Sequence, residues 1–230
     1  MKYTNPRFLW KLCALLGLAT AVCGLLLMPV FPATGAGYLA GYGEPVFAFE
    51  FARSVPDLLL VFGAPDDPAR AGRILDMVHG TYWDFGFLLI YSGFIYTFFL
   101  AAFNSTGTQV WRVFAVLGIV AGLADIVENI VLLGLMADIE TARYLPVLPF
   151  PVYAKFIAIT LCGLGVGAYL LGTRKPVWMV LGGLAIIGAL AGVPGLVAPQ
   201  DYGQYVGSAV TVFWVIQLAY AGRAGFRKSV

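Results

Sequence analysis

The amino-acid sequence predicts an all-α fold: a polytopic membrane protein built as a bundle of six transmembrane helices, with a helical first loop outside the membrane. Of the 230 residues, 60% are hydrophobic and 11% are charged, whereas soluble domains carry about 25% charged residues. The mean hydropathy is +0.87. Six apolar stretches are each long enough to cross a hydrocarbon core of about 30 Å. Because these stretches leave no separate soluble domain, we expect residues 1–230 to form a single integral-membrane domain.

The apolar runs set the approximate bounds of the six spans, which are 12–31, 83–103, 113–136, 150–172, 177–198 and 205–222 in chain order. The first run follows Lys2, Arg7 and Lys11, as a secretory signal would. Its apolar stretch is longer than the hydrophobic core of such a signal, which has about 7–15 residues. We therefore expect it to remain as a helix, and six crossings then bring both termini to one side of the membrane.

The first loop, residues 32–82, is far longer than an ordinary connection and is expected to hold structure of its own. Ser54 and Asp57 have the spacing of a helix N-cap and its acidic N3 partner, and the apolar run Leu58–Phe62 follows them. Asp67-Pro68 marks a second helix start. The pattern predicts a short helix resting on the bilayer or the bundle, then a surface helix that leads into the second span.

Basic residues are distributed unequally between the two sides of the predicted bundle. Nine Lys and Arg residues flank the spans on the side of the termini, four lie on the opposite side, and Lys155 lies within a span. Lys and Arg are retained on the cytoplasmic side of membrane proteins. The distribution therefore predicts that both termini are cytoplasmic and that residues 32–82 face outward.

Composition and motifs exclude several classes of function. A formal net charge of +2, with the basic residues at span ends, argues against nucleic-acid binding. Three cysteines inside apolar spans predict no disulfide framework, and a single histidine excludes bis-histidine haem and three-histidine zinc sites. The sequence contains no nucleophile elbow, P-loop or dinucleotide-binding glycine motif. We therefore expect neither a metal nor a cofactor.

Pairs of glycines spaced four residues apart lie in the third, fourth and fifth spans, where small residues let membrane helices approach closely. They are Gly118/Gly122, Gly163/Gly167 and Gly188/Gly192. Their first interpretation is packing within the bundle. The same faces are also candidates for binding a membrane-protein partner or a second copy of the chain.

The third span contains polar residues that share one helix face. Asp125, Glu128 and Asn129 are spaced i, i+3 and i+4, on the face that continues the Gly118/Gly122 stripe, so they point into the bundle. Lys155 in the fourth span lies at a depth from which its side chain can reach Glu128. Intramembrane carboxylates are costly, which makes them candidates for function. The alternative is a purely structural, hydrogen-bonded lock between the third and fourth spans.

Further candidate residues lie near the outer side of the bundle. Asp84 begins the predicted second span and either joins an acidic, aromatic pocket or caps the helix through its first-turn amides. Glu50 and Arg53 in the first loop either join the same pocket or form a solvated i, i+3 ion pair. The residues around Asp84 are His79, Tyr82, Trp83 and Tyr91.

The arrangement of Phe49-Glu50-Phe51-Ala52, Asp84, Asp125-x-x-Glu128-Asn129 and Lys155 resembles a group of uncharacterised bacterial multi-pass membrane proteins that carry the acidic D-x-x-E-N motif in a transmembrane helix. The likeness covers residues 47–160. No activity is carried over with it. We expect the protein to lie in the bacterial inner membrane.

The leading function that the sequence predicts is non-enzymatic: an outward-open acidic and aromatic pocket binds a cation or an amphiphilic ligand, in a carrier, a sensor or a complex subunit. One alternative is a membrane enzyme doing acid–base chemistry on a lipid or isoprenoid, with Glu128, Asp125 and Asp84 as candidate catalytic residues. Another is a structural subunit of a membrane complex. Membrane lipids are expected partners in each case. The candidate ligand-binding residues are Glu50, Arg53, His79, Tyr82, Trp83, Asp84, Tyr91, Asp125, Glu128, Asn129 and Lys155.

Overall fold

A computed structural model describes residues 5–37 and 39–227 of the chain, and every regular element in that part is a helix. Six helical segments are long and apolar enough to cross a membrane, which confirms the predicted fold class. They are α1 (Pro6–Leu27) continued by η1 (Met28–Val30), α4 (Arg70–Thr106), α5 (Val110–Ala137), α6 (Pro149–Gly172), α7 (Pro176–Ala191) continued by α8 (Val193–Val197), and α10 (Gln204–Phe226).

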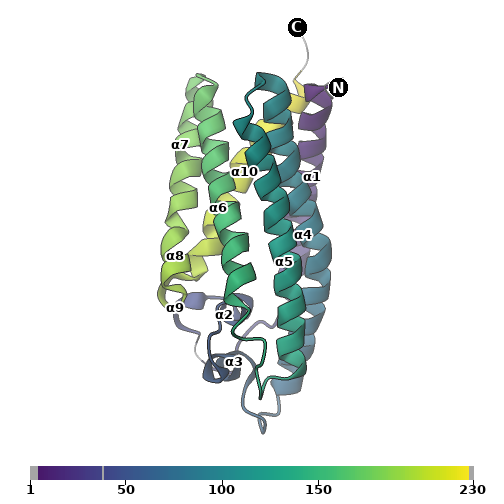
Figure 1. The fold of residues 1–230 in the computed structure, drawn as a ribbon, viewed down its shortest axis with the longest axis vertical. Helices are drawn as coiled ribbons and strands as arrows, with labels where there is room; N and C mark the ends of the chain where they lie inside the picture. The colour runs from purple at the N-terminus through teal and green to yellow at the C-terminus, as the bar shows by residue number, and fades with distance from the viewer. Residues whose placement is uncertain (1–4, 38, 228–230) are drawn as a thin grey trace.

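The six long helices form a ring. Around it, α1 packs on α4, α4 on α5, α5 on α6, α6 on α7, α7 on α10, and α10 packs back on α1. The two ends of the described chain lie at one end of this elongated bundle, and α2 and α3 lie at the opposite end (Figure 1). We call the first the inner end and the second the outer end, following the orientation that the sequence predicts.

The first loop forms a helical cap on the outer end of the ring. It contains η2 (Ala40–Tyr42), α2 (Pro45–Glu50) and α3 (Val55–Phe62), and the short α9 (Pro199–Tyr202) packs against η2. The predicted cap of α3 is confirmed, because the Ser54 hydroxyl accepts the Asp57 N–H at 3.3 Å and the Asp57 carboxylate accepts the Ser54 N–H at 2.9 Å. Leu58 and Phe62 are buried, so α3 rests on the bundle.

The connection from the cap to the ring is a tight turn followed by one uninterrupted helix. Asp67 accepts the Ala69 N–H at 2.8 Å and a bond from the Arg73 guanidinium at 2.7 Å. The bond from Arg73 holds the pKa of the Asp67 carboxyl below its usual value. From Arg70 the helix runs 37 residues without a break. The predicted surface helix and the predicted second span are therefore a single helix, α4.

The glycine pairs are covered by helices of the same chain. A methyl group added at Gly118 would meet Ile95 of α4, and one added at Gly122 would meet Ser92 of the same helix. At Gly167 the neighbour is α7, and at Gly188 it is α10. The first interpretation of these pairs, close packing within the bundle, is confirmed.

An aromatic cluster fills the ring near its inner end. The Trp10 ring lies 5.3 Å from Phe98, 5.9 Å from Tyr169 and 5.2 Å from Tyr220, measured between ring centroids. The hydroxyls of Tyr169 and Tyr220 are 3.2 Å apart and share a hydrogen bond. Because these rings come from α1, α4, α6 and α10, they close the interior of the ring toward the inner end.

Candidate functional site

A buried ion cluster lies in the ring, with Lys155 of α6 at its centre. The Lys155 Nζ lies 2.6 Å from Glu128 Oε1, 3.1 Å from Glu50 Oε1 and 3.3 Å from Asp125 Oδ1. The predicted pair between Lys155 and Glu128 is confirmed. All four side chains are buried. One ammonium group therefore joins α2 of the cap to α5 and α6 of the ring.

Two hydrogen bonds attach α4 to this cluster. The Tyr91 hydroxyl donates to Asp125 Oδ2 at 2.7 Å, and the Asn129 amide donates to Asp84 Oδ2 at 2.8 Å. The close approach of α4 and α5 at Gly118 and Gly122 makes these short bonds geometrically accessible. Since α4 begins at Arg70, Asp84 lies in the middle of a helix. The alternative that Asp84 caps the helix is therefore wrong.

Glu50 reaches the cluster because the cap turns back into the ring at the end of α2. Its residue is 8% exposed and its carboxylate pairs with Lys155. Arg53 donates instead to the carbonyl oxygens of Ala52, at 2.7 Å, and Glu50, at 3.4 Å, and its guanidinium lies 5.5 Å from the Tyr153 ring centroid. The alternative of a solvated Glu50–Arg53 ion pair is wrong, because the Glu50 carboxylate points into the bundle.

The cluster contains more acid than base. Four carboxyl groups, from Glu50, Asp84, Asp125 and Glu128, share one ammonium group, from Lys155. Glu50 Oε2 and Glu128 Oε2 are buried and have no hydrogen-bond partner in the described chain. The Glu128 side chain neighbours Glu50, and burial raises the pKa of the Glu50 carboxyl. Ionising every carboxyl group at such short separations in a low-dielectric site costs free energy. A bound proton or a bound cation would lower that cost.

A cavity of about 810 Å³ adjoins the cluster. Its polar wall includes Glu50, Asp84, Asp125, Asn129 and Lys155. Its aromatic wall includes Phe87, Tyr91 and Trp214, with the Trp214 ring 5.4 Å from Tyr91 and 6.2 Å from Phe87. Glu128 is fully buried and is not a lining residue, so it acts on the cavity through Lys155.

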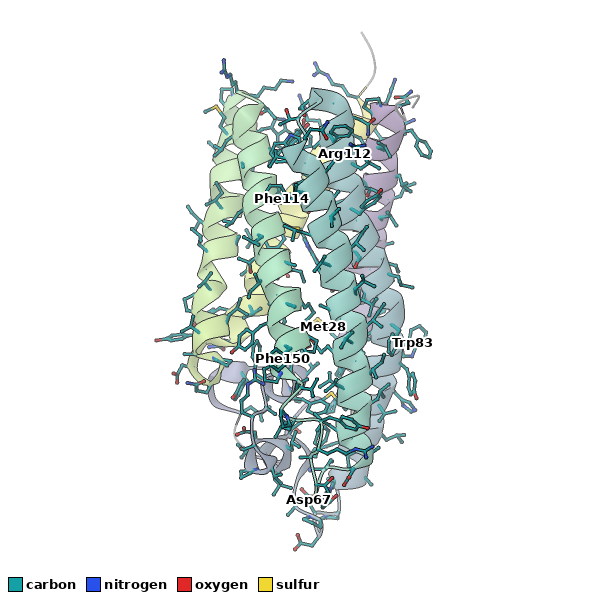
Figure 2. The ribbon with its side chains drawn as sticks, in the orientation of Figure 1. Met28, Asp67, Trp83, Arg112, Phe114 and Phe150 are labelled. Atoms are coloured by element: carbon teal, nitrogen blue, oxygen red, sulfur yellow. The ribbon has the colours of Figure 1, made fainter. Side chains whose placement is uncertain are left out.

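The structure does not bring every predicted site residue to this cavity. His79, Tyr82 and Trp83 are exposed and do not line it. Figure 2 shows Trp83 projecting from the side of the bundle. Arg53 lines a separate, smaller pocket on the outer surface, together with Tyr42 and other residues of the cap.

Sequence reasoning missed the contribution of the first and last helices. Thr20 of α1 and Ser208, Thr211 and Trp214 of α10 line the cavity. None of them is charged, and serine and threonine in a membrane helix give no specific signal. Trp214 does give a signal in the sequence. Tryptophan is usually enriched near span ends, whereas Trp214 lies within its predicted span.

The acidic cluster does not form a metal site. Within residues 5–37 and 39–227, no group of three or more His, Cys, Asp or Glu side chains is placed to hold a metal ion. The position at which the carboxylates of Glu50, Asp125 and Glu128 converge holds the Lys155 ammonium group.

No protein-family model, curated protein or solved structure matches this chain. The class of protein is therefore assigned from the fold alone. The protein is a polytopic integral membrane protein with six helices able to span the bilayer and with clusters of aromatic rings between them.

Proposed function

We propose that the protein binds an organic cation in the acidic cavity of the ring, as a carrier, a sensor or a subunit of a membrane complex. The observation that carries this proposal is the excess of carboxyl groups over ammonium groups at the cavity wall. A cation there would balance the charge that Lys155 leaves uncompensated. The rings of Tyr91 and Trp214 offer the faces that favour an ammonium group over water.

Asp84 is the carboxylate most available to a ligand. It lines the cavity and is half-buried, whereas Asp125 and Glu50 are buried and both pair with Lys155. None of the ion pairs found in the described chain involves Asp84. Its hydrogen bond from Asn129 orients the group without neutralising it.

Replacing Asp84 by asparagine is expected to lower the affinity for ethanolamine, a small protonated amine, by about tenfold or more, which is about 1.4 kcal/mol. The fold should persist, because the amide oxygen can still accept the bond from Asn129. Binding is measured as the rise in thermal unfolding midpoint of the purified protein. A ligand at about ten times its Kd adds about 1.4 kcal/mol of stability.

Asp76→Asn is the matched control, because Asp76 lies on the same helix, is exposed and does not line the cavity. This variant should bind ethanolamine as the wild type does, and sodium chloride at equal ionic strength should give no comparable shift. The proposal fails if ethanolamine does not stabilise the wild type, or if it stabilises Asp84→Asn equally well.

A second candidate is a membrane enzyme that moves a proton on a lipid or isoprenoid, with Asp84, Asp125 or Glu128 as the exchanging group. The supporting observation is that the carboxyl groups of Glu50, Asp84 and Asp125 lie together at one cavity wall, where burial raises the pKa of Glu50. General acid–base chemistry needs such a pair. Incubation with extracted membrane lipids, followed by mass spectrometry, distinguishes the candidates: a new product favours an enzyme, and unaltered bound lipid favours a binding protein.

We further propose that the protein lies in the bacterial inner membrane. The distribution of basic residues supports cytoplasmic termini. A cysteine at Asp66→Cys should then react with a membrane-impermeant maleimide added to intact cells. Asp66 is exposed and adjoins Asp67, which lies at the tip of the outer end (Figure 2).

The matched control for this labelling is Thr108→Cys, an exposed position in the loop between α4 and α5 at the inner end. It should react only after the cells are opened. The wild type serves as a blank, because Cys13, Cys23 and Cys162 lie within the spans. Labelling of Thr108→Cys but not Asp66→Cys in intact cells would reverse the orientation.

A further inference from the structure

The exposed residues of the cavity wall lie mainly on two facing helices. Every lining residue contributed by α4, α5 and α6 is buried or half-buried. By contrast, Leu25 of α1 is 72% exposed and Val215 of α10 is 59% exposed, although both line the cavity. The cavity therefore opens at the side of the bundle, between α1 and α10.

This opening is closed toward the inner end. There α1 and α10 touch: the Arg7 guanidinium donates to the Arg227 carbonyl at 2.9 Å, and the rings of Trp10 and Tyr220 lie 5.2 Å apart. The two helices are also close at Gly17, since a methyl group added to it would meet Leu218 of α10. From Gly17 toward the outer end, residues of both helices line the cavity.

The dimensions of the opening match one leaflet of the bilayer. From Gly17 to Met28, α1 rises about 17 Å at about 1.5 Å per residue. One half of the hydrocarbon core is about 15 Å thick. Both helices are membrane spans, so the opening faces the hydrocarbon region toward the outer end. Glu44 lines the cavity and is exposed, which places a carboxylate beside the cap at this side of the cavity.

Two buried polar atoms of the cavity-lining residues lack partners. Glu50 Oε2 needs a donor and the Trp214 indole N–H needs an acceptor, and neither has a hydrogen-bond partner in the described chain. Both residues line the cavity, and Glu50 is more than nine-tenths buried. A head group with an ammonium donor and a neighbouring oxygen acceptor has the chemistry to satisfy both atoms. Leaving such atoms unpaired in a buried site is costly.

We infer that the ligand is a single-chain amphiphile with an amino-alcohol head, and that it enters from the bilayer between α1 and α10. Its ammonium group lies at the carboxylates and its hydrocarbon chain occupies the lateral opening. This inference rests on the proposed binding of an organic cation and adds the class of ligand and its route. A hydrocarbon chain in that opening stays in contact with lipid, so entry requires no exposure of the chain to water.

The test uses the whole protein in nanodiscs of phosphatidylglycerol, a lipid without an ammonium group. The probes are ethanolamine, which has the head group alone, and a long-chain amino alcohol that carries a photoreactive diazirine in its chain. On irradiation, the long-chain probe should label α1 between residues 17 and 28 and α10 between residues 204 and 218. Labelled peptides are identified by mass spectrometry.

Ala21→Trp fills the opening from α1 at an exposed position, so the fold should tolerate it. We expect this variant to need at least about tenfold more long-chain probe for half-maximal labelling, while its affinity for ethanolamine changes less than about twofold. Val22→Trp is the matched control, because Val22 is the next residue, is exposed and does not line the cavity. It should behave as the wild type does.

The outcomes separate this inference from the proposed function. If ethanolamine binds but Ala21→Trp leaves labelling unchanged, or if the label falls on other helices, the lateral route is wrong and the cation site stands. If neither probe binds the wild type, both are wrong. Equal loss of both probes in Ala21→Trp would also overturn the route, because it would place Ala21 at the head-group site and not in the opening for the chain.

Discussion

Replacing Lys155 by methionine is expected to lower the free energy of unfolding by about 3–5 kcal/mol, because it leaves buried carboxylates without their cation. Methionine keeps an unbranched chain of similar length, so the loss reports on charge rather than on an empty space. The measurement is unfolding of the purified protein in a mild detergent. Lys155 contacts Glu50, Asp125 and Glu128, so no single carboxylate substitution should cost as much.

The loss in this variant should depend on pH. Burial raises the pKa of Glu50 above its unfolded value and the Lys155 ammonium group lowers it, so the folded variant, which lacks that ammonium group, takes up a proton there more readily than the folded wild type. A contribution of this kind is fully present below the unfolded pKa of about 4.3 and is lost as the pH rises through the folded value. Lys155→Met should therefore be closer to the wild type at about pH 5 than at about pH 8.

Two further variants test whether the effect of Lys155→Met comes from the buried ion pairs. Lys175→Met, at an exposed position, should change stability by no more than about 0.5 kcal/mol. Adding Glu128→Gln to Lys155→Met should recover part of the lost free energy of unfolding, because it removes one of the buried carboxylates that have no cation beside them. Wild-type stability of Lys155→Met at about pH 8 would show that ion pairing does not hold α5 to α6.

The parts of the structure that sequence could predict are those set by local rules. Hydropathy places all six spans, because an apolar run of that length has no other stable environment. The pair between Glu128 and Lys155 follows from helical rise and from the shared face of Asp125, Glu128 and Asn129. Both predictions need only the geometry of one helix and its depth in the membrane.

The burial of Glu50 could not be predicted from local rules. Glu50 lies 105 residues before its partner Lys155 in the chain, in the first loop and outside the predicted spans. Its burial depends on the path of the cap, which turns α2 into the outer end of the ring. Glu50 also changes the charge balance of the cluster, because it adds a fourth carboxyl group to the three that lie within the spans. No periodicity of α2 alone predicts that turn.

The aromatic wall could have been assigned more sharply from helical periodicity. On α4, Asp84, Phe87 and Tyr91 are spaced i, i+3 and i+7 and share a face, and all three line the cavity. Tyr82 and Trp83 directly precede Asp84, so they lie around the helix from it and remain exposed. Closeness in sequence wrongly suggested Tyr82 and Trp83, whereas the helical repeat selects Phe87 together with the predicted Tyr91.

Neutralising Asp125 and Glu128 together, as Asp125→Asn and Glu128→Gln, is expected to preserve the fold and weaken ethanolamine binding about a hundredfold, at about 1.4 kcal/mol per tenfold. The fold should survive, because Lys155 keeps Glu50 at 3.1 Å and the new amide oxygen can accept the Tyr91 hydroxyl. Neutral isosteres of buried ionic groups are often tolerated. Binding should fall, because Lys155 then repels a second cation with less carboxylate to offset it.

This double variant separates a lock from a binding site through two readouts on one sample. The thermal midpoint without ligand reports on the contact between α5 and α6, and its rise with ethanolamine reports on the cavity. Asp66→Asn with Asp76→Asn is the matched control, since it removes two exposed carboxylates and should alter neither readout. If the midpoint rises while ethanolamine binds as before, Asp125 and Glu128 serve only to hold the helices together, because a cation site cannot lose two buried charges without losing affinity.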